Sequence, residues 1–133
     1  MKRICVRGIV IKDNELAVIF RRKIKDGIIS EYYVIPGAGV ESTEELEEAL
    51  KRELQEELNI EVNIKELAFK TEQDDRIEYF YTCEYLNGTF ELNGEEIERN
   101  TEENYYEPTF IALDKINDFN LQKEVKDYFN NQN

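Results

Sequence analysis

Apolar positions in the first third of the chain follow the two-residue period of β-strands. Residues 3–11 are mostly apolar and β-branched, and a polar turn at residues 12–14 separates them from a second alternating run, residues 15–22. Two such runs around a short turn are typical of a hairpin of half-buried strands. Another turn at residues 25–27 leads into a third predicted strand, residues 28–35. The chain is therefore expected to begin with a β-sheet.

The apolar period changes to that of an α-helix over residues 42–58. One apolar stripe is formed by Leu46, Ala49, Leu50, Leu54 and Leu58. Ser42 and Glu45 have the spacing of a capping box at the start of the helix. Asn59 follows at a position that requires left-handed backbone, which asparagine tolerates better than most residues. We therefore expect a helix that begins at residue 42 and ends at residue 58.

The second half of the chain predicts further strands, an acidic loop and a second helix. Strands are expected at residues 62–70, 77–86, 89–92 and 109–113. Asn87 and Gly88 have the composition of a hairpin turn. Residues 95–107 contain six acidic residues and one arginine, which is typical of a mobile loop, and residues 120–129 predict an amphipathic helix. These elements predict an α+β fold with a mixed sheet and two main helices, formed by residues 1–133 as one domain.

Three glutamates of the first helix are predicted to lie beside its apolar stripe. At about 100° per residue from the first leucine, Glu57 falls at about 20°, Glu53 at about 340° and Glu56 at about 280°. Glu45 and Glu48 fall on the far side and are expected to face solvent. A carboxylate beside the core costs several kcal/mol unless positive charge or hydrogen bonds compensate it. The pattern therefore predicts bound divalent cations or an ion pair with an arginine or lysine of the N-terminal strands.

Composition limits which metal ion such carboxylates could bind. The chain has no histidine, which removes imidazole ligands and every histidine-based catalytic pair. A site made of oxygen ligands alone favours hard cations such as Mg²⁺ or Mn²⁺. The segment from Pro36 to Gly39, just before the helix, allows a sharp backbone turn and could add carbonyl ligands. We therefore expect a Mg²⁺ or Mn²⁺ site between these glutamates of the helix and the segment before it.

The charged residues separate a basic N-terminal part from an acidic remainder. The net charge is −13, which disfavours DNA or RNA as a polymeric partner. The basic side chains that could approach an anionic ligand are Arg3, Arg7, Arg21, Arg22, Lys23 and Lys25. No apolar run has the length of a membrane span, and the first residues lack a signal-peptide cleavage site, so we expect a cytoplasmic protein without a membrane partner. The two cysteines are expected to be buried apolar groups.

Residues 38–60 resemble the Nudix box, G-x5-E-x7-R-E-U-x-E-E-x-G-U, in which U is a bulky aliphatic residue. All charged positions of the motif are present, at Glu44, Arg52, Glu53, Glu56 and Glu57. Ala38 and Asn59 stand in place of the two motif glycines. A basic strand end before the box, and a late strand followed by a C-terminal helix, are also similar to this family. The chain is thus identified as a member of the Nudix hydrolases by its motif.

The resemblance implies a fold, a reaction and a set of metal ligands. The Nudix fold is an α/β/α sandwich with a mixed sheet, and the implied reaction is metal-dependent hydrolysis of a pyrophosphate bond in a nucleoside diphosphate linked to another group. Glu53, Glu56 and Glu57 would hold Mg²⁺ or Mn²⁺ by this resemblance. The backbone carbonyl of Ala38 or Gly37 would be a further ligand.

The same resemblance implies roles for the remaining charged residues. Arg52 would orient Glu53, and Glu44 would be mainly structural at the start of the helix. Without histidine the general base is a carboxylate, which is either Glu53 or a glutamate outside the box. The acidic segment offers Glu95, Glu96, Glu98, Glu102 and Glu103. Of these Glu98 is our choice, although plain solvation would explain any single one of them.

The sequence leaves the substrate and the oligomeric state open. Arg7 and Arg21 could bind phosphate groups, and nucleoside triphosphates, oxidised nucleotides, ADP-ribose and dinucleoside polyphosphates all stay candidates. The tyrosines that could stack on a base, or simply belong to the core, are Tyr32, Tyr33, Tyr79, Tyr81, Tyr105 and Tyr106. The alternative function is a non-catalytic, nucleotide-sensing Nudix domain, which the two replaced glycines motivate. A homodimer is one option for the assembly.

Overall fold

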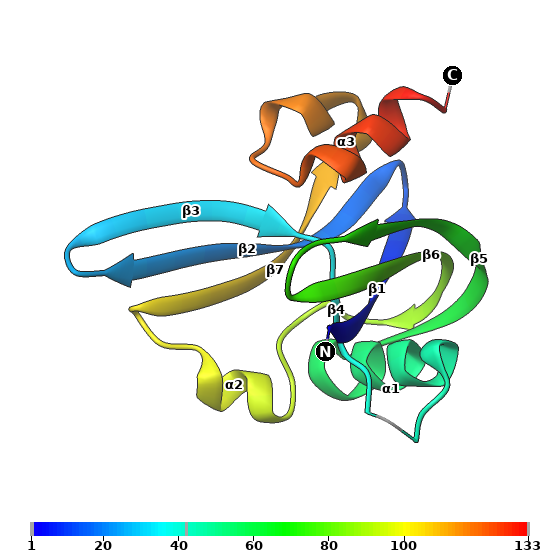
Figure 1. Ribbon diagram of the computed structural model, residues 1–133, viewed down its shortest axis with the longest axis horizontal. Coiled ribbons are helices and arrows are strands. Elements are labelled where there is room, and N and C mark those ends of the chain that lie inside the picture. Colours follow the sequence, from blue (N-terminus) through cyan, green and yellow to red (C-terminus); the bar gives the residue numbers. More distant parts are fainter. Residues whose placement is uncertain (1, 42, 133) are drawn as a thin grey trace.

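The computed structural model describes residues 2–41 and 43–132 and shows a mixed β-sheet between helical layers (Figure 1). β1 (Arg3–Lys12) and β2 (Glu15–Lys25) form the predicted hairpin, and β3 (Ile28–Val34) follows after a second turn. A short strand, β4 (Gly37–Gly39), lies where the sequence predicted only a turn. The first third of the chain is therefore β-structure, as its alternating pattern predicted.

The remaining elements complete the sheet and add the helices. The strands are β5 (Ile60–Glu72), β6 (Arg76–Gly88) and β7 (Asn104–Ala112). The helices are α1 (Leu46–Leu58), α2 (Glu95–Arg99), a 3₁₀ helix (Leu113–Asp118) and α3 (Lys123–Asn130). In the described part of the chain no helix combines the length and the apolar character that crossing a membrane requires.

The sheet divides where β1 and β2 separate. The strand order is β3-β2-β1-β6-β5, with β4 paired to β1 and β7 paired to β2. β1 and β2 pair beside their connecting turn, at Ile11 with Leu16 and at Lys12 with Glu15. Beyond this point β1 pairs with β4 and, in parallel, with β6, whereas β2 pairs with β3 and β7. In Figure 1 the strands β2, β3 and β7 accordingly extend away from β1, β5 and β6.

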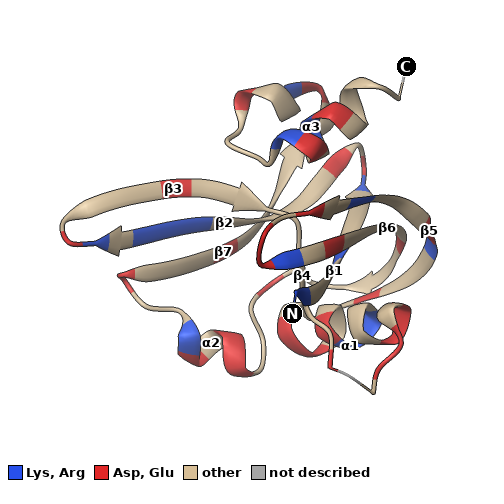
Figure 2. Cartoon of the chain, viewed as in Figure 1, with Lys and Arg blue, Asp and Glu red and all other residues tan. Residues whose placement is uncertain are grey.

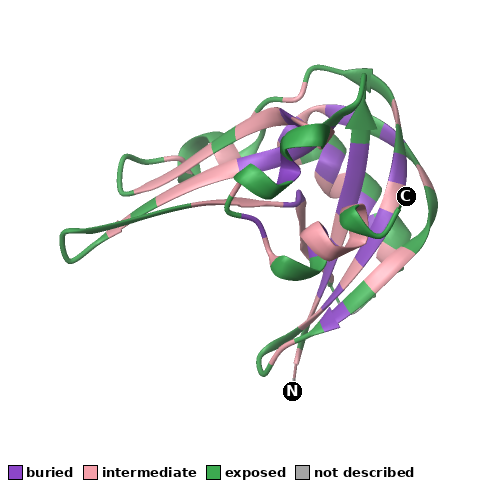
Figure 3. Ribbon diagram, turned by 90° about the horizontal axis from the view of Figure 1, so that it is seen from above, coloured by how far each residue is buried: buried purple, intermediate pink, exposed green. Residues whose placement is uncertain are grey.

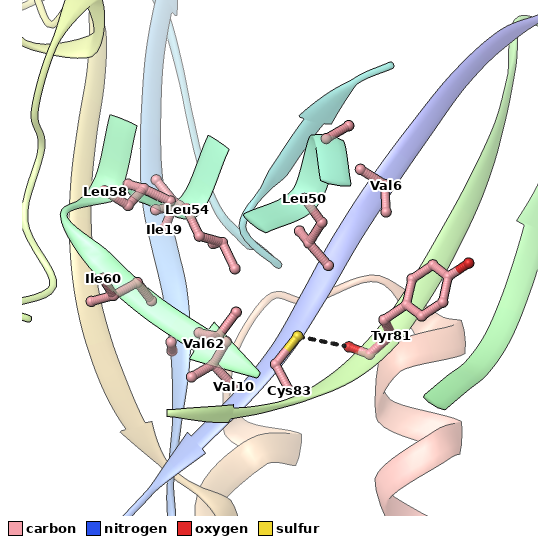
Figure 4. Packing of buried hydrophobic residues seen from close by; sticks show 12 residues of the cluster. Val6, Val10, Ile19, Leu50, Leu54, Leu58, Ile60, Val62, Tyr81 and Cys83 are labelled. Carbon is pink, nitrogen blue, oxygen red and sulfur yellow. Dashed lines mark hydrogen bonds between the residues drawn. The ribbon is translucent and has the colours of Figure 1, made fainter. Parts of the chain in front are cut away.

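Apolar side chains form one core on each face of the sheet. Leu50 and Leu54 of α1 pack with Val6 and Val10 of β1 in the first core (Figure 4). The second core lies under the C-terminal helices and includes Leu16, Val18, Phe80, Ile116 and Val125. Buried residues accordingly concentrate in the central strands (Figure 3). Helices on both faces of a mixed sheet make the predicted α/β/α sandwich.

The end of α1 agrees with its sequence signals, but its start does not. Asn59 has φ 60° and ψ 29°, so the predicted left-handed cap is confirmed. The helix begins at Leu46, four residues later than predicted, and residues 43–45 are not helical. Glu45 takes the N-cap position with extended backbone and makes no capping hydrogen bond with its side chain. The predicted partner in the capping box, Ser42, lies outside the described residues.

Two predicted elements near residue 90 are wrong. Residues 89–92 form no strand, because Gly88 ends β6 with φ 103° and does not form a hairpin turn. A Cβ on Gly88 would overlap the carbonyl oxygen of Asn59, so glycine allows close packing of β6 against the cap of α1. The predicted loop 95–107 instead contains α2 and the beginning of β7. The second main helix begins at Lys123, three residues later than expected.

Candidate active site

A cavity of ≈ 890 Å³ opens where β1 and β2 separate, and it gathers most of the predicted site residues. β4, the C-terminal half of α1 and α2 form the rest of its wall. The predicted residues that line it are Arg7, Arg21, Gly37, Ala38, Arg52, Glu53, Glu56 and Glu57. In Figure 2 basic residues colour much of the ribbon of β2, and acidic residues colour much of the ribbons of α1 and α2. Residues far apart in the sequence therefore share one site.

Arg52 connects the first glutamate of the motif with two of its later ones. Its Nε and Nη2 atoms donate to the two carboxylate oxygens of Glu44 at 2.8 and 3.0 Å. Its Nη1 atom donates to Glu53 at 3.0 Å and to Glu56 at 3.4 Å. The hydrogen bond from Arg52 lowers the pKa of Glu44, and the pKa of Arg52 is raised in turn. Arg52 thus contacts Glu53 and holds the segment before α1 against the helix.

Glu57 lies half-buried at the edge of the core, where the helical wheel places it. Its Oε2 atom accepts a hydrogen bond from the backbone N–H of Glu96 at 3.1 Å. Burial raises the pKa of Glu57, and the negative charge of Glu53 raises it further, whereas the hydrogen bond from the Glu96 N–H lowers it. Glu45 and Glu48 are exposed, as predicted. Glu57 is therefore compensated by a backbone donor, and no pair with the N-terminal basic strands is seen among the described residues.

The oxygen atoms around this cavity suit a hard divalent cation. Glu53, Glu56 and Glu57 reach it from α1, and the carbonyl groups of Gly37 and Ala38 lie on the facing strand β4. In the described chain no three carboxylates are gathered around one point, because Glu53 and Glu56 turn to Arg52. The raised pKa of Glu57 is typical of a carboxylate without a cationic partner. The donor set fits Mg²⁺ or Mn²⁺ if these carboxylates exchange Arg52 for the ion.

The backbone of β4 explains why alanine is tolerated at position 38. Ala38 pairs with Val6 of β1, and it is not one of the described residues with positive φ. A Cβ on Gly37, by contrast, would overlap the carbonyl oxygen of Val6. The steric need for glycine therefore lies at position 37, one residue before the first position of the motif.

Arg7 and Arg21 enter the cavity from the two diverging strands. The Nε atom of Arg7 donates to Glu78 at 3.0 Å, and Glu78 is only 3% exposed. Arg21 donates to Asn104 at 2.6 Å, and its guanidinium lies 3.9 Å from the ring centroid of Tyr106. Both arginines are thus held by neighbouring strands, in positions where they can meet an anionic ligand.

The acidic segment contributes different glutamates from the one chosen from the sequence. Glu95 and Glu96 line the cavity, whereas Glu98 is exposed and is not among its described lining residues. Arg99 pairs with Glu95 at 2.8 Å and with Glu96 at 3.0 Å. The short helix α2 places Glu95 and Glu96 at the cavity, with the side chain of Glu95 largely exposed at its rim. This placement could not be predicted from a segment that was expected to be a loop.

Three arginines of the cavity were not predicted as site residues. Arg3 was noted only as part of the basic N-terminal region, and Arg76 gave no signal on its own. Arg76 starts β6, which pairs in parallel with β1, so its approach to Arg3 depends on a long-range strand pairing. Arg99 gave the one available signal, because it is the isolated arginine within the acidic run 95–107.

Comparisons with known proteins agree with this architecture. A family model described as NUDIX domain matches residues 1–129. A NUDIX hydrolase from Nitrosomonas europaea has a TM-score of 0.72 and 20% identity, and the match covers 98% of this chain and 72% of that one. A NUDIX-family hydrolase from Clostridium perfringens has a TM-score of 0.70 and 11% identity over 100% and 99% of the two chains.

Some of the similar structures are named for an activity. An ADP-ribose pyrophosphatase from Streptococcus suis matches with a TM-score of 0.59 and 17% identity over 86% of this chain and 76% of that one. A comparison with curated protein sequences finds no match. At these identities the solved structures establish a shared fold, in agreement with the layers and strand order described above.

Proposed function

This chain belongs to the Nudix hydrolase family, and we propose that it hydrolyses a pyrophosphate bond in a nucleoside diphosphate linked to another group, with Mg²⁺ or Mn²⁺ bound. One observation carries the proposal. The cavity brings Glu53, Glu56 and Glu57 of the motif together with arginines that can bind phosphate oxygens. An acidic protein with −13 net charge needs such local positive charge to hold a diphosphate.

The proposed roles follow from the contacts of each residue. Glu53, Glu56 and Glu57 would hold the metal ion, with a carbonyl of Gly37 or Ala38 as a further ligand. The bound ion supplies charge screening for the phosphates and lowers the pKa of an attacking water. Arg52 orients Glu53 through the hydrogen bond at 3.0 Å, and through Glu44 it keeps the segment before α1 in place.

Arg7 and Arg21 would bind the phosphate groups of the substrate. Water would attack one phosphorus, the bridging P–O bond would break, and a carboxylate would accept the proton of the water. Glu53 is our first candidate for this base. Among the glutamates outside the box, the cavity favours Glu95 or Glu96 over Glu98, since they line it.

A hydrolysis screen tests the proposal directly. The panel contains nucleoside triphosphates, an oxidised nucleotide, ADP-ribose and a dinucleoside polyphosphate, each with Mg²⁺, with Mn²⁺ and with a chelator. We expect cleavage of at least one compound that stops with the chelator, and identification of both products shows which phosphorus is attacked. Tight nucleotide binding without turnover of any compound would refute the proposal.

That outcome would support the alternative of a non-catalytic, nucleotide-sensing Nudix domain. One observation favours it, namely that Arg52 engages the carboxylates of Glu53 and Glu56 that a metal ion would need. Calorimetric titration with Mg²⁺ distinguishes the two. A catalytic site should bind the ion in the presence of nucleotide, and a sensing domain should bind nucleotide equally well without it.

We further infer that residues 1–133 act as one Nudix domain on free small molecules in the cytoplasm, without a nucleic-acid polymer or a membrane as partner. A homodimer is one option for the assembly, and β3 offers a sheet edge with Ile28 and Ile29 exposed at 69% and 60%. Light scattering of the purified protein decides the oligomeric state.

A further inference from the structure

Arginine and lysine are distributed very differently over this molecule. The chain has seven arginines and ten lysines. Six of the arginines line the cavity, and no lysine is among its described lining residues. Because the planar guanidinium matches phosphate and carboxylate groups better than an ammonium does, arginine is favoured where anions are recognised. The cavity therefore has the composition of a site for more than one anionic group.

Two of these arginines lie side by side at one end of the cavity. Arg3 of β1 and Arg76 of β6 are register partners in the parallel pair of strands, and both line the cavity. Like charges opposite each other on neighbouring strands destabilise a sheet unless an anion lies between them. Arg7 lies four residues after Arg3 on β1, so both side chains leave the same face of the strand. Arg3, Arg7 and Arg76 thus line the same part of the sheet within one cavity.

The acidic residues nearby neutralise this group only in part. Glu78 takes the charge of Arg7 at 3.0 Å, and it lies 4.0 Å from the Nε atom of Arg76. Arg76 is also 3.9 Å from Asp75, which is largely exposed. Among the described residues Arg3 forms no ion pair and no side-chain hydrogen bond. A net positive charge remains at Arg3 and Arg76.

Arg3 lies directly against the strand that carries the proposed carbonyl ligands. A Cβ on Gly39 would come within 2.7 Å of the Nη2 atom of Arg3, so glycine leaves room for the guanidinium over β4. Gly39 is adjacent to Ala38, a proposed metal ligand, and pairs with Cys5 of β1. An anion held by Arg3 would therefore border the diphosphate site.

The described lining of the cavity offers little surface for stacking a second base. Tyr106 is its only aromatic residue in the described part of the chain, and the guanidinium of Arg21 already lies 3.9 Å from the centroid of its ring. Base recognition depends largely on stacking against aromatic rings or guanidinium planes. At the Arg3 end the available chemistry is instead that of charge-assisted hydrogen bonds to an anion.

We propose that Arg3 and Arg76 form a second anion subsite beside the diphosphate site to which Arg7 is assigned. The preferred substrate is then a nucleoside diphosphate whose second moiety carries its own negative charge, as a phosphate or a carboxylate. This inference rests on the proposed function, because it names the substrate class of the same cavity. With this subsite the protein would prefer such compounds to nucleoside diphosphates that are linked to a neutral sugar.

Two matched pairs of substrates test the subsite and distinguish the two anions. The first pair is UDP-glucuronate and UDP-glucose, which differ by one carboxylate. The second pair is ADP-ribose and the same compound with a phosphate on its terminal ribose. We expect kcat/KM to be about tenfold higher for the charged member of at least one pair, as one charge-assisted hydrogen bond would give. Equal values within both pairs would overturn the proposal while leaving the hydrolase function intact.

Variants show whether the arginines cause the preference. Arg3→Gln and Arg76→Gln should each reduce the charged-to-neutral ratio of kcat/KM at least fivefold, since each removes about one such bond. Lys65→Gln removes the same charge from an exposed position on β5 and should leave the ratio unchanged. A ratio that stays the same in both arginine variants, or falls equally in all three, contradicts the assignment.

A binding measurement keeps the subsite testable if none of these compounds is hydrolysed. Calorimetric titration with inorganic pyrophosphate, in the presence of a chelator, compares the wild type with the double variant Arg3→Gln/Arg76→Gln and with Lys65→Gln. We expect weaker binding in the double variant alone. Equal binding by all three proteins overturns the subsite, whereas the absence of hydrolysis by itself counts only against the proposed function.

Discussion

At the scale of single residues, Gly37 and Ala38 show where the loop before α1 requires glycine. Ala38 lies in β4 opposite Val6 without a left-handed backbone, so its side chain is accommodated. Gly37 packs so closely on β1 that a Cβ would overlap the carbonyl oxygen of Val6. The replaced motif glycine is therefore a smaller change than the sequence alone would indicate.

Single substitutions at positions 37 and 38 compare how much each position requires glycine. Gly37→Ala should lower the free energy of unfolding by about 2 kcal/mol, because the added methyl forces β4 away from β1. Ala38→Gly should cost only about 0.5–1 kcal/mol, through the greater backbone freedom of glycine in the unfolded chain. Urea unfolding of both variants measures the difference. Equal losses would show that β4 does not pack on β1 in this way.

Glu57 is a residue whose proposed function conflicts with stability. Its pKa is raised from 4.5 by burial, so its ionisation destabilises the metal-free protein as pH rises from 4.5 through the folded-state pKa. Glu57→Gln should therefore raise the thermal midpoint of the metal-free protein by about 2 °C at pH 7, with little effect at pH 4. The same variant should lose hydrolysis, because it lacks one of the proposed metal ligands.

The exposed residue Glu48 provides the matched control for this prediction. Glu48→Gln removes the same charge from the solvent face of α1, so thermal midpoint and hydrolysis rate should both stay close to those of the wild type. Scanning calorimetry with a chelator and initial-rate assays with Mg²⁺ provide the two readouts. If both variants behave alike in both assays, Glu57 has no special role.

Predictions for single residues succeed where the residues lie on a regular helix. The period of α1 alone placed Glu57 at the edge of the core and Glu45 and Glu48 in solvent, and the structure agrees. Glu56, which was also predicted beside the apolar stripe, is exposed, since its position is farthest from the stripe. The acidic segment was predicted as a loop and offered no such period, because α2 has five residues and no apolar stripe to set its orientation. The sequence could therefore indicate that this segment contributes to the site, but it could not show that Glu96 lines the cavity and Glu98 does not.

At the scale of elements, the cap of α1 connects the helix with β6 and the segment after it. Asn59 is left-handed, and its side-chain amide donates to the carbonyl oxygen of Thr89 at 3.2 Å and to Glu91 at 3.1 Å. Gly88 lies against the carbonyl oxygen of Asn59. This explains why residues 87 and 88, which have hairpin composition, form no hairpin turn.

Two substitutions separate the backbone and side-chain contributions of this cap. Asn59→Ala should reduce the free energy of unfolding by about 1–2 kcal/mol, because alanine disfavours the left-handed conformation. Asn59→Gly keeps that conformation available and should cost less, although it loses both amide contacts. Chemical unfolding monitored by circular dichroism ranks the variants. A glycine variant less stable than the alanine variant would show that the amide contacts dominate.

At the scale of the whole molecule, function depends on strand pairings that leave little trace in the sequence. β1 and β2 are neighbours in the chain and pair at their turn, yet the cavity exists because they separate beyond it. The parallel pairing of β1 with β6 joins Arg3 to Arg76 across most of the chain. The motif predicted the layers and the acidic side of the site, whereas Arg76 could not be placed beside Arg3 without this pairing.

Glu78 is buried where four parts of the chain meet. It accepts hydrogen bonds from Arg7 of β1 at 3.0 Å, Thr71 of β5 at 3.1 Å and Gln122 before α3 at 3.2 Å. Burial alone would raise the pKa of Glu78, but the charge and hydrogen bond of Arg7, with the other donors, hold it below its ordinary value. Ionised Glu78 therefore stabilises the folded state.

The pH dependence of stability tests this network across the molecule. Because the folded-state pKa of Glu78 is lowered from 4.5, its contribution is present above pH 4.5 and is lost as pH falls through the folded-state pKa. Glu78→Gln should lower the free energy of unfolding by about 2 kcal/mol at pH 7, since it leaves Arg7 without its partner, and by much less near pH 3. Glu72→Gln breaks the exposed pair with Lys2 and should have a far smaller effect at either pH. Urea unfolding at both pH values measures these differences, and a loss at pH 7 no larger than that of Glu72→Gln would show that the buried network adds no stability.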